Sequence, residues 1–130
     1  MWSGYSVPTT ITIIQEINAM FYILNETEVH QLAPDCVRHV VARTKNLLNC
    51  RLDMKKGHTA PSHHHPHEQC TYIVSGTVEV TMGTETKVLH AGDSVSFDPD
   101  VEHTYFALED AVVLESFTPM RDDIINFKSK

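Results

Sequence analysis

Residues 57–76 of the 130-residue chain read GHTAPSHHHPHEQCTYIVSG and hold five of its nine histidines. Imidazole is the commonest metal ligand in proteins, and a local excess of it indicates a metal site. In an extended strand, side chains two residues apart point the same way, so His63 and His65 can reach one ion while His64 points away. Gln69 follows a tight turn at Pro66 and can bring an amide oxygen to the same ion.

The alternative reading of this stretch is an expression tag or a histidine-rich surface tract. A tag lies at a terminus, whereas this tract lies mid-chain, is interrupted by Pro66, and continues into the β-branched and aromatic residues 71–74. That context favours a metal site built into a folded β-structure.

Length and composition indicate one globular domain. A chain of 130 residues with 42% hydrophobic side chains can bury a core, and no apolar run is long enough to span a membrane. The net charge of -7, with no basic cluster, argues against nucleic acid as a partner. Cys36, Cys50 and Cys70 form no CxxC pair, so we expect reduced thiols in a cytoplasmic protein.

Residues 1–20 are expected to form an N-terminal extension. The spacing of Ile13, Ile17 and Met20 fits a helix, whereas residues 10–13 alternate like a strand, and both alternatives stay open. The segment lacks the basic region of a signal peptide. A third alternative is that Met20 is the natural start and the residues before it are loosely held.

From residue 21 onward, short stretches of alternating polarity separated by turn residues predict an all-β sandwich or barrel. Residues 25–35 are expected to be a connection, and the amphipathic residues 118–127 to form a turn of helix that covers one end of the barrel. The predicted strands are, in order, 21–24, 37–42, 46–54, 71–74, 77–82, 86–89, 94–97, 103–107 and 111–117.

His103 is a second candidate ligand, just past the turn at residues 98–100. A lone histidine in a strand is usually structural, but the chain resembles the cupin superfamily at two places that give His103 a context. The chain resembles the second cupin motif in Gly92, the turn at Pro99 and His103, in that order. The first motif is matched, with glutamine in the usual glutamate position, by Gly57, His63, His65, Gln69 and Gly76.

The resemblance to cupins covers roughly residues 47–127 and implies a fold and a cofactor. The implied fold is the cupin double-stranded β-helix, a jelly-roll barrel, as a single domain over residues 21–130. Cupins are often dimeric and hold one divalent metal inside the barrel. Oxygen and nitrogen ligands suit nickel, zinc, iron or manganese, and the sequence does not choose among them.

Within the cupins, the chain is similar to the KdgF-type pectin-degradation proteins in residues 65–69, 101–103, 107–110 and 117–121. That family linearises 4,5-unsaturated monouronates and binds its metal through three histidines and a glutamine. The resemblance implies that the metal ligands here are His63, His65, Gln69 and His103. The family's pocket motif, Asp-x-Phe-x-x-x-Arg, corresponds to Glu115, Phe117 and Arg121, with glutamate replacing aspartate.

Glu115 shares one face of its predicted strand with Val113 and Phe117, and a buried carboxylate there needs a partner. The structural explanation is an ion pair with Arg121 or Arg51. The functional explanation is a catalytic general acid or base in the pocket.

Three further side chains are assigned to the substrate pocket. Arg121 is expected to clamp a substrate carboxylate bidentately. Phe117 either packs on the sugar face or belongs to the core. Tyr105 lies on the same face as His103 and either lines the pocket as a substrate-binding residue or merely fills it.

The expected activity is a metal-dependent ring opening and tautomerisation of 4,5-unsaturated monouronates. Neutral ligands leave the full +2 charge on the ion, which favours a small anionic sugar as substrate. The alternatives are another cupin enzyme, such as an iron-dependent dioxygenase, isomerase or cyclase of a small anion, or a non-catalytic sugar-binding cupin. An exposed strand edge favours a homodimer, and no membrane or nucleic acid is expected as a partner.

Overall fold

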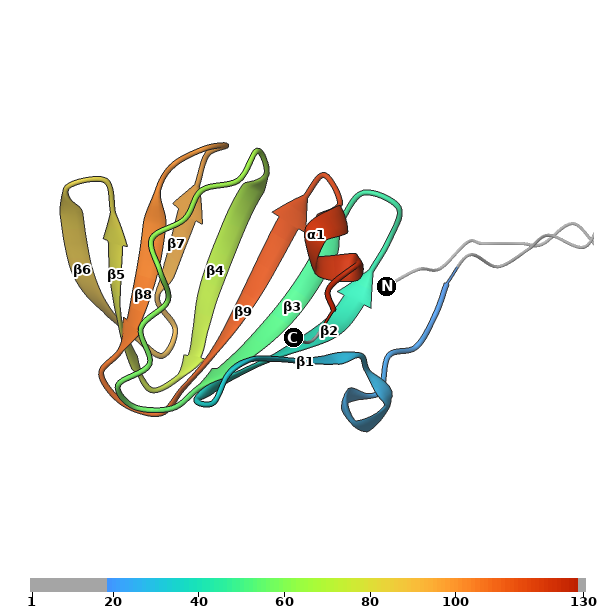
Figure 1. Ribbon diagram of the computed structural model, residues 1–130, viewed down its shortest axis with the longest axis horizontal. Helices are drawn as coiled ribbons and strands as arrows, with labels where there is room; N and C mark the ends of the chain where they lie inside the picture. The colour runs from blue at the N-terminus through green and yellow to red at the C-terminus, as the bar shows by residue number, and fades with distance from the viewer. Residues whose placement is uncertain (1–18, 129–130) are drawn as a thin grey trace, which may run out of the picture.

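The computed structural model describes residues 19–128, which form nine strands and two short helical segments (Figure 1). The helical segments are the 3-10 helix η1 (Leu24–Glu26) and α1 (Asp122–Ile125). The alternatives for residues 1–18 lie outside the described residues. The strands are β1 (Val29–Ala33), β2 (Cys36–Arg43), β3 (Leu48–Met54), β4 (Glu68–Ser75), β5 (Thr77–Met82), β6 (Glu85–His90), β7 (Ser94–Phe97), β8 (His103–Ala107) and β9 (Ala111–Thr118).

The strands form two antiparallel sheets, as the all-β jelly-roll prediction requires. The larger sheet has the order β1-β2-β3-β9-β4-β7 and the smaller one β6-β5-β8. Strands far apart in the sequence are neighbours, since β9 lies between β3 and β4. The main core contains residues of both sheets, including Ile73 and Val113 from the larger and Val78 and Tyr105 from the smaller. The two sheets therefore pack face to face.

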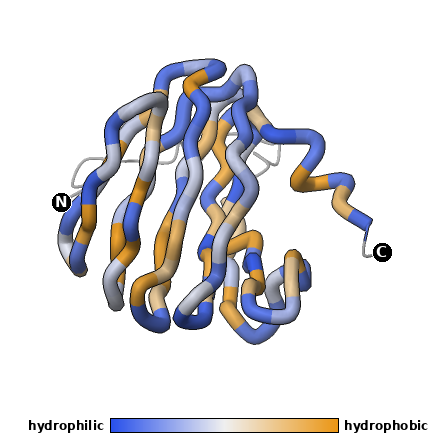
Figure 2. The backbone as a smooth tube through the Cα atoms, turned by 60° about the vertical axis from the view of Figure 1, so that its left-hand side comes forward, coloured by the Kyte–Doolittle hydropathy of each residue, from blue (hydrophilic) through white to orange (hydrophobic). Residues whose placement is uncertain are grey.

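Period-two alternation of the side chains selects the inner face of the larger sheet. In β3 the buried residues are Leu48, Cys50, Leu52 and Met54, as predicted, and the residues between them are half-buried. In Figure 2, hydrophobic and hydrophilic stretches alternate along the strands. Across the sheet, Cys50 faces Glu115, which faces Thr71 of β4. A row of inward side chains thus brings Glu115 into the interior.

The C-terminal segment covers one end of the larger sheet, as predicted. Helix α1 lies over the sheet beside β9 and β3 (Figure 1). Its Ile124 is 2% exposed and packs in a second core cluster with Val40, Leu48, Cys50 and Phe117. This packing anchors the segment that begins with Arg121.

Two predictions near residue 21 were wrong. Residues 21–24 form no strand, because Phe21 is 97% exposed and Ile23 55% exposed, so neither packs on a sheet. The predicted connection at residues 25–35 contains β1, which pairs with β2 through a register of Val29 opposite His39. Most of β1 is exposed, so its sequence lacks the apolar alternation of the inner strands.

The three cysteines are free thiols, as predicted. Cys36 and Cys50 are buried, and burial raises the pKa of each thiol to about 12. Cys70 is exposed on the outer face of β4. The two buried thiols are therefore core residues without thiolate reactivity.

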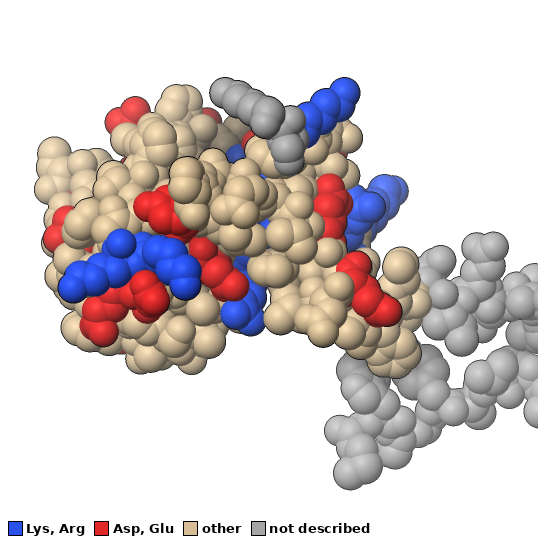
Figure 3. Space-filling view, turned by 60° about the horizontal axis from the view of Figure 1, so that its bottom comes forward, with Lys and Arg blue, Asp and Glu red and all other residues tan. Residues whose placement is uncertain are grey.

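The surface view in Figure 3 shows basic and acidic side chains close together on one face of the described chain. Among residues 19–128, no helix has the length and apolar character needed to cross a membrane.

Candidate metal centre

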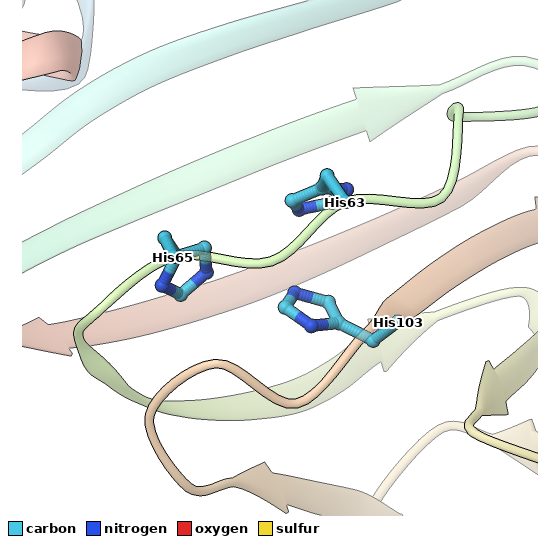
Figure 4. A group of neighbouring side chains, drawn as sticks. All are labelled: His63, His65 and His103. Atoms are coloured by element: carbon cyan, nitrogen blue, oxygen red, sulfur yellow. The ribbon is translucent and has the colours of Figure 1, made fainter.

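Three imidazoles meet inside the barrel, and each offers one nitrogen that lies within 4.8 Å of the others. They belong to His63, His65 and His103, whose rings point toward one another in Figure 4. The ring centroids are 4.4 Å apart for His63 and His103, and 5.2 Å for His65 and His103. The predicted convergence of these three residues is confirmed.

Backbone hydrogen bonds hold this geometry. His63 forms an isolated antiparallel bridge with His103, with N–H···O distances of 3.1 and 2.9 Å. The segment around His63 is therefore extended, although it is a single bridge rather than the predicted strand. His64 is exposed and lies 3.6 Å from Asp100, so alternate side chains do point in opposite directions, as predicted.

Asp100 ties the turn before β8 to the histidine segment. Its backbone N–H donates to the His65 carbonyl at 2.8 Å, and its φ of 65° lies in the left-handed region. Aspartate tolerates this conformation better than most residues. Aspartate can therefore adopt the backbone conformation of this turn, at a position where the cupin motif often has glycine.

The rings of His63 and His103 keep their inward nitrogens free for an ion, whereas His65 Nε2 lies at hydrogen-bond distance from the Gln69 amide oxygen. The Nδ1 atoms of His63 and His103 lie 3.0 and 2.8 Å from the carbonyls of Pro61 and Val101, which turns each Nε2 inward. Among the described residues, His103 Nε2 is buried without a hydrogen-bond partner. A buried imidazole nitrogen without a partner, with its second nitrogen on a carbonyl, is the arrangement of a metal-bound histidine.

Burial favours the neutral form of two of these imidazoles. It lowers the pKa of His65 to about 4, and the nearby positive charge of Arg121 acts in the same direction. Burial also lowers the pKa of His103. The neutral imidazole is the form that binds a metal, so His65 and His103 are ready ligands at neutral pH.

Gln69 completes the predicted ligand set. Its side chain is 2% exposed, and its amide oxygen lies 2.8 Å from His65 Nε2. Two ligands on adjacent positions of an ion with bonds of about 2.1 Å lie roughly 3 Å apart, so this spacing suits a shared ion. The donors of His63, His65, Gln69 and His103 therefore fit a divalent metal.

Glu115 lies behind Gln69 and is buried, as its inward face predicts. Its Oε2 accepts hydrogen bonds from Gln69 Nε2 at 2.8 Å and the Tyr105 hydroxyl at 2.9 Å. Burial raises the pKa of Glu115, while the hydrogen bond from Tyr105 acts in the opposite direction.

The ion-pair explanation of Glu115 was wrong. The guanidinium of Arg51 bonds Asp53, and that of Arg121 bonds Asp123. Arg51 follows Cys50 in β3 and so points to the opposite, outer face of the sheet. Among the described residues, the partners of Glu115 are neutral hydrogen-bond donors.

Arg121 approaches the metal centre across Phe117. Its guanidinium lies over the Phe117 ring at 4.9 Å, and that ring lies 5.7 Å from the His65 ring. Asp123 holds the guanidinium through Nε at 3.2 Å and Nη2 at 2.5 Å. Phe117 is 1% exposed and belongs to a core cluster, which agrees with the core alternative for this residue.

Sequence reasoning missed three residues around the site. Thr71 bonds the Gln69 amide at 3.0 Å, and Phe97 stacks on His103 with centroids 4.0 Å apart. Period-two alternation from Gln69 identifies Thr71 as inward, so a signal existed. Asp123 offered none, because its contact with Arg121 depends on the first turn of α1.

A fold of two antiparallel sheets enclosing three histidines and a glutamine defines a class of protein. A model of the Cupin domain family matches residues 50–117, and the chain therefore belongs to the cupins. Pectin degradation protein KdgF of Dickeya dadantii (strain 3937) is 26% identical over 107 residues, which cover 81% of this chain and 97% of that protein.

Two solved structures are similar in both sequence and fold. KdgF from Halomonas sp. superposes with a TM-score of 0.76 and 32% identity, covering 81% of this chain and 99% of that one. An RmlC-like cupin from Shewanella frigidimarina gives a TM-score of 0.77 and 27% identity, covering 82% and 96%. Within the cupins, the chain is a KdgF-like member.

Proposed function

We propose that the protein opens the ring of 4,5-unsaturated monouronates, the products of pectin or alginate breakdown, with a divalent metal held by His63, His65, Gln69 and His103. The observation that carries this proposal is the cluster of neutral inward donors with Arg121 beside it. The KdgF relatives support the substrate class, because one of them is named for pectin degradation.

The donor set favours an anionic guest. Three imidazoles and an amide leave the positive charge of a bound ion uncompensated by its ligands. A bound divalent ion supplies Lewis-acid polarisation of a substrate oxygen. Arg121 adds a second positive charge at the edge of the site, and its planar fork suits the uronate carboxylate.

The chain's own residues bind the sugar and move its protons. The Arg121 guanidinium binds the substrate carboxylate, and the Phe117 ring packs beneath this guanidinium. Both hydrogen bonds that the structure gives Glu115 among the described residues fall on Oε2, which leaves Oε1 to accept a proton from the substrate. Tyr105 contributes the hydroxyl that bonds Oε2 and keeps the carboxylate in place.

The reaction balances as an isomerisation. Glu115 takes the proton of the anomeric hydroxyl, the bond between the anomeric carbon and the ring oxygen breaks, and an aldehyde and an enolate form. The proton then goes to C4, the carbon of the former double bond that does not carry the enolate oxygen, and this gives the linear keto-aldehyde. No external oxidant or reductant is consumed.

The deciding experiment incubates the metal-loaded protein with unsaturated galacturonate or mannuronate monomer and follows the loss of the conjugated C=C–carboxylate absorbance. We expect a rate well above spontaneous opening. Arg121→Ala should keep its metal and lose about 100-fold in kcat/KM, whereas the control Arg51→Ala, on the outer face, should behave as the wild type. Turnover no faster than the spontaneous rate, with metal bound, contradicts the proposal.

A further inference from the structure

Gln69 is surrounded by oxygen atoms on the side away from the imidazoles. Its amide nitrogen lies 2.8 Å from Glu115 Oε2, 2.9 Å from the Tyr105 hydroxyl and 3.0 Å from Thr71 Oγ1. Its amide oxygen faces the opposite way, 2.8 Å from His65 Nε2. All these side chains are buried, so their partners are one another.

The hydrogens of this group settle the orientation of the amide. An amide nitrogen carries two hydrogens and an amide oxygen none, while an ionised carboxylate only accepts. Tyr105 already donates to Glu115 Oε2, which accepts from both the phenol and Gln69. If the amide of Gln69 turned over, its oxygen would face Glu115 Oε2 with no hydrogen between them. Glu115 thus determines which end of Gln69 faces the imidazoles.

We propose that Glu115, besides the proton transfer assigned to it above, positions the amide oxygen of Gln69 toward the metal, and that the two side chains together take the place of one carboxylate ligand. This inference rests on the metal site of the proposed function and not on its sugar substrate. The carboxyl group of Glu115 thus lies one hydrogen bond behind the ligand atom of Gln69.

The pairing also explains the glutamine at position 69. A glutamate there would place a second carboxylate at hydrogen-bond distance from Glu115, and adjacent carboxylates repel each other. The glutamine at the ligand position and the glutamate behind it therefore require each other.

The first test measures binding of Ni²⁺ alone to the metal-free protein by competition with a chelator. Glu115→Leu removes the acceptor and should weaken binding at least 10-fold, because groups that orient a ligand contribute 10–100-fold to metal affinity. Glu115→Gln can still accept from Gln69 through its amide oxygen and should recover part of that loss. The control Glu68→Gln removes an exposed carboxylate next to Gln69 and should change affinity less than twofold. Affinity of Glu115→Leu within twofold of the wild type overturns the inference.

The second test exchanges the two side chains and reads thermal unfolding without metal, which keeps the inference testable if Glu115→Leu does not fold. Gln69→Glu should melt below the wild type. The double variant Gln69→Glu with Glu115→Gln should recover at least half of the lost melting temperature. A double variant that melts no higher than Gln69→Glu overturns the inference. Absence of uronate turnover with both results intact would instead remove the proposed function and leave this pairing standing.

Discussion

Two side-chain groups of this fold, one around His30 and one around His103, each contain a buried histidine, and they differ in what the histidine nitrogens contact. His30 of β1 is 3% exposed, and His103 of the metal centre is 2% exposed. In His30, Nδ1 accepts from Arg38 Nη2 at 2.8 Å and Nε2 donates to Glu28 at 2.9 Å. In His103, one nitrogen bonds a backbone carbonyl and the other, buried, has no partner among the described residues.

The difference shows that burial alone does not mark a ligand. The lone pair of His30 is already used by Arg38, so this ring has nothing to offer an ion. The buried Nε2 of His103 has no such partner among the described residues, and His103 offers a nitrogen that lies within 4.8 Å of one nitrogen each of His63 and His65. The two groups should therefore respond in opposite ways to mutation: one loses metal and the other loses stability.

The largest expected effect is loss of metal from His103→Ala. Removing one of four donors, a histidine whose inward Nε2 is buried and has no partner among the described residues, should weaken metal binding more than 100-fold. Metal per chain after gel filtration, with circular dichroism to confirm the fold, measures this. The control is His64→Ala, which removes an exposed imidazole from the same segment and should retain full metal content. Equal metal content in the two variants would contradict the comparison.

The next effect is a loss of stability in His30→Ala with no loss of metal. Without the imidazole, the half-buried Arg38 guanidinium loses its acceptor, and a cavity forms beneath Phe127. We expect the free energy of unfolding to fall by about 3 kcal/mol. Denaturant melts of metal-free protein measure it, with the exposed His90→Ala as the control that stays within about 0.5 kcal/mol. A metal content below that of the wild type would show that the two groups are not independent.

A smaller loss of stability is expected from substitution of Phe127, whose ring packs against His30 and Arg38. Its ring lies 4.6 Å from the His30 ring and 5.2 Å from the Arg38 guanidinium. Phe127→Leu keeps apolar bulk but removes the ring contacts, so unfolding should cost about 1 kcal/mol less than in the wild type. Phe106→Leu, at an exposed position of the smaller sheet, is the matched control. A similar loss in both variants would assign the effect to general hydrophobicity.

The same contrast explains which parts of the molecule could be predicted from the sequence. Strands β3, β5, β7 and β8 could be placed from polarity alone, because one face of each packs on the core and its side chains alternate. The shared direction of His63 and His65 could be predicted from their local spacing. His103, which lies far from them in the sequence, was identified only through the resemblance to cupins.

Features that depend on distant partners could not be predicted. The burial of His30 is one such feature, because it depends on Arg38 of the next strand and on Phe127 at the other end of the chain. The apolar residues 21–24 suggested a strand, but within residues 19–128 no strand pairs with them. The partners of Glu115 required the register of β9 against β4, which places Thr71 opposite it.

The smallest expected effect is at Glu28, the outer partner of His30. The Glu28 side chain is 49% exposed, so water and salt weaken its pairing with His30 Nε2. Glu28→Ala should therefore lower the free energy of unfolding by about 0.5 kcal/mol, far less than His30→Ala, because water can replace the carboxylate but nothing replaces the imidazole as the acceptor for Arg38. Melts at low and high salt measure this, and the small difference should shrink further at high salt. If Glu28→Ala instead costs as much as His30→Ala, the exposed carboxylate would be the main stabiliser of this group, and the contrast between a hydrogen-bonded histidine and an open metal ligand would not rest on Arg38.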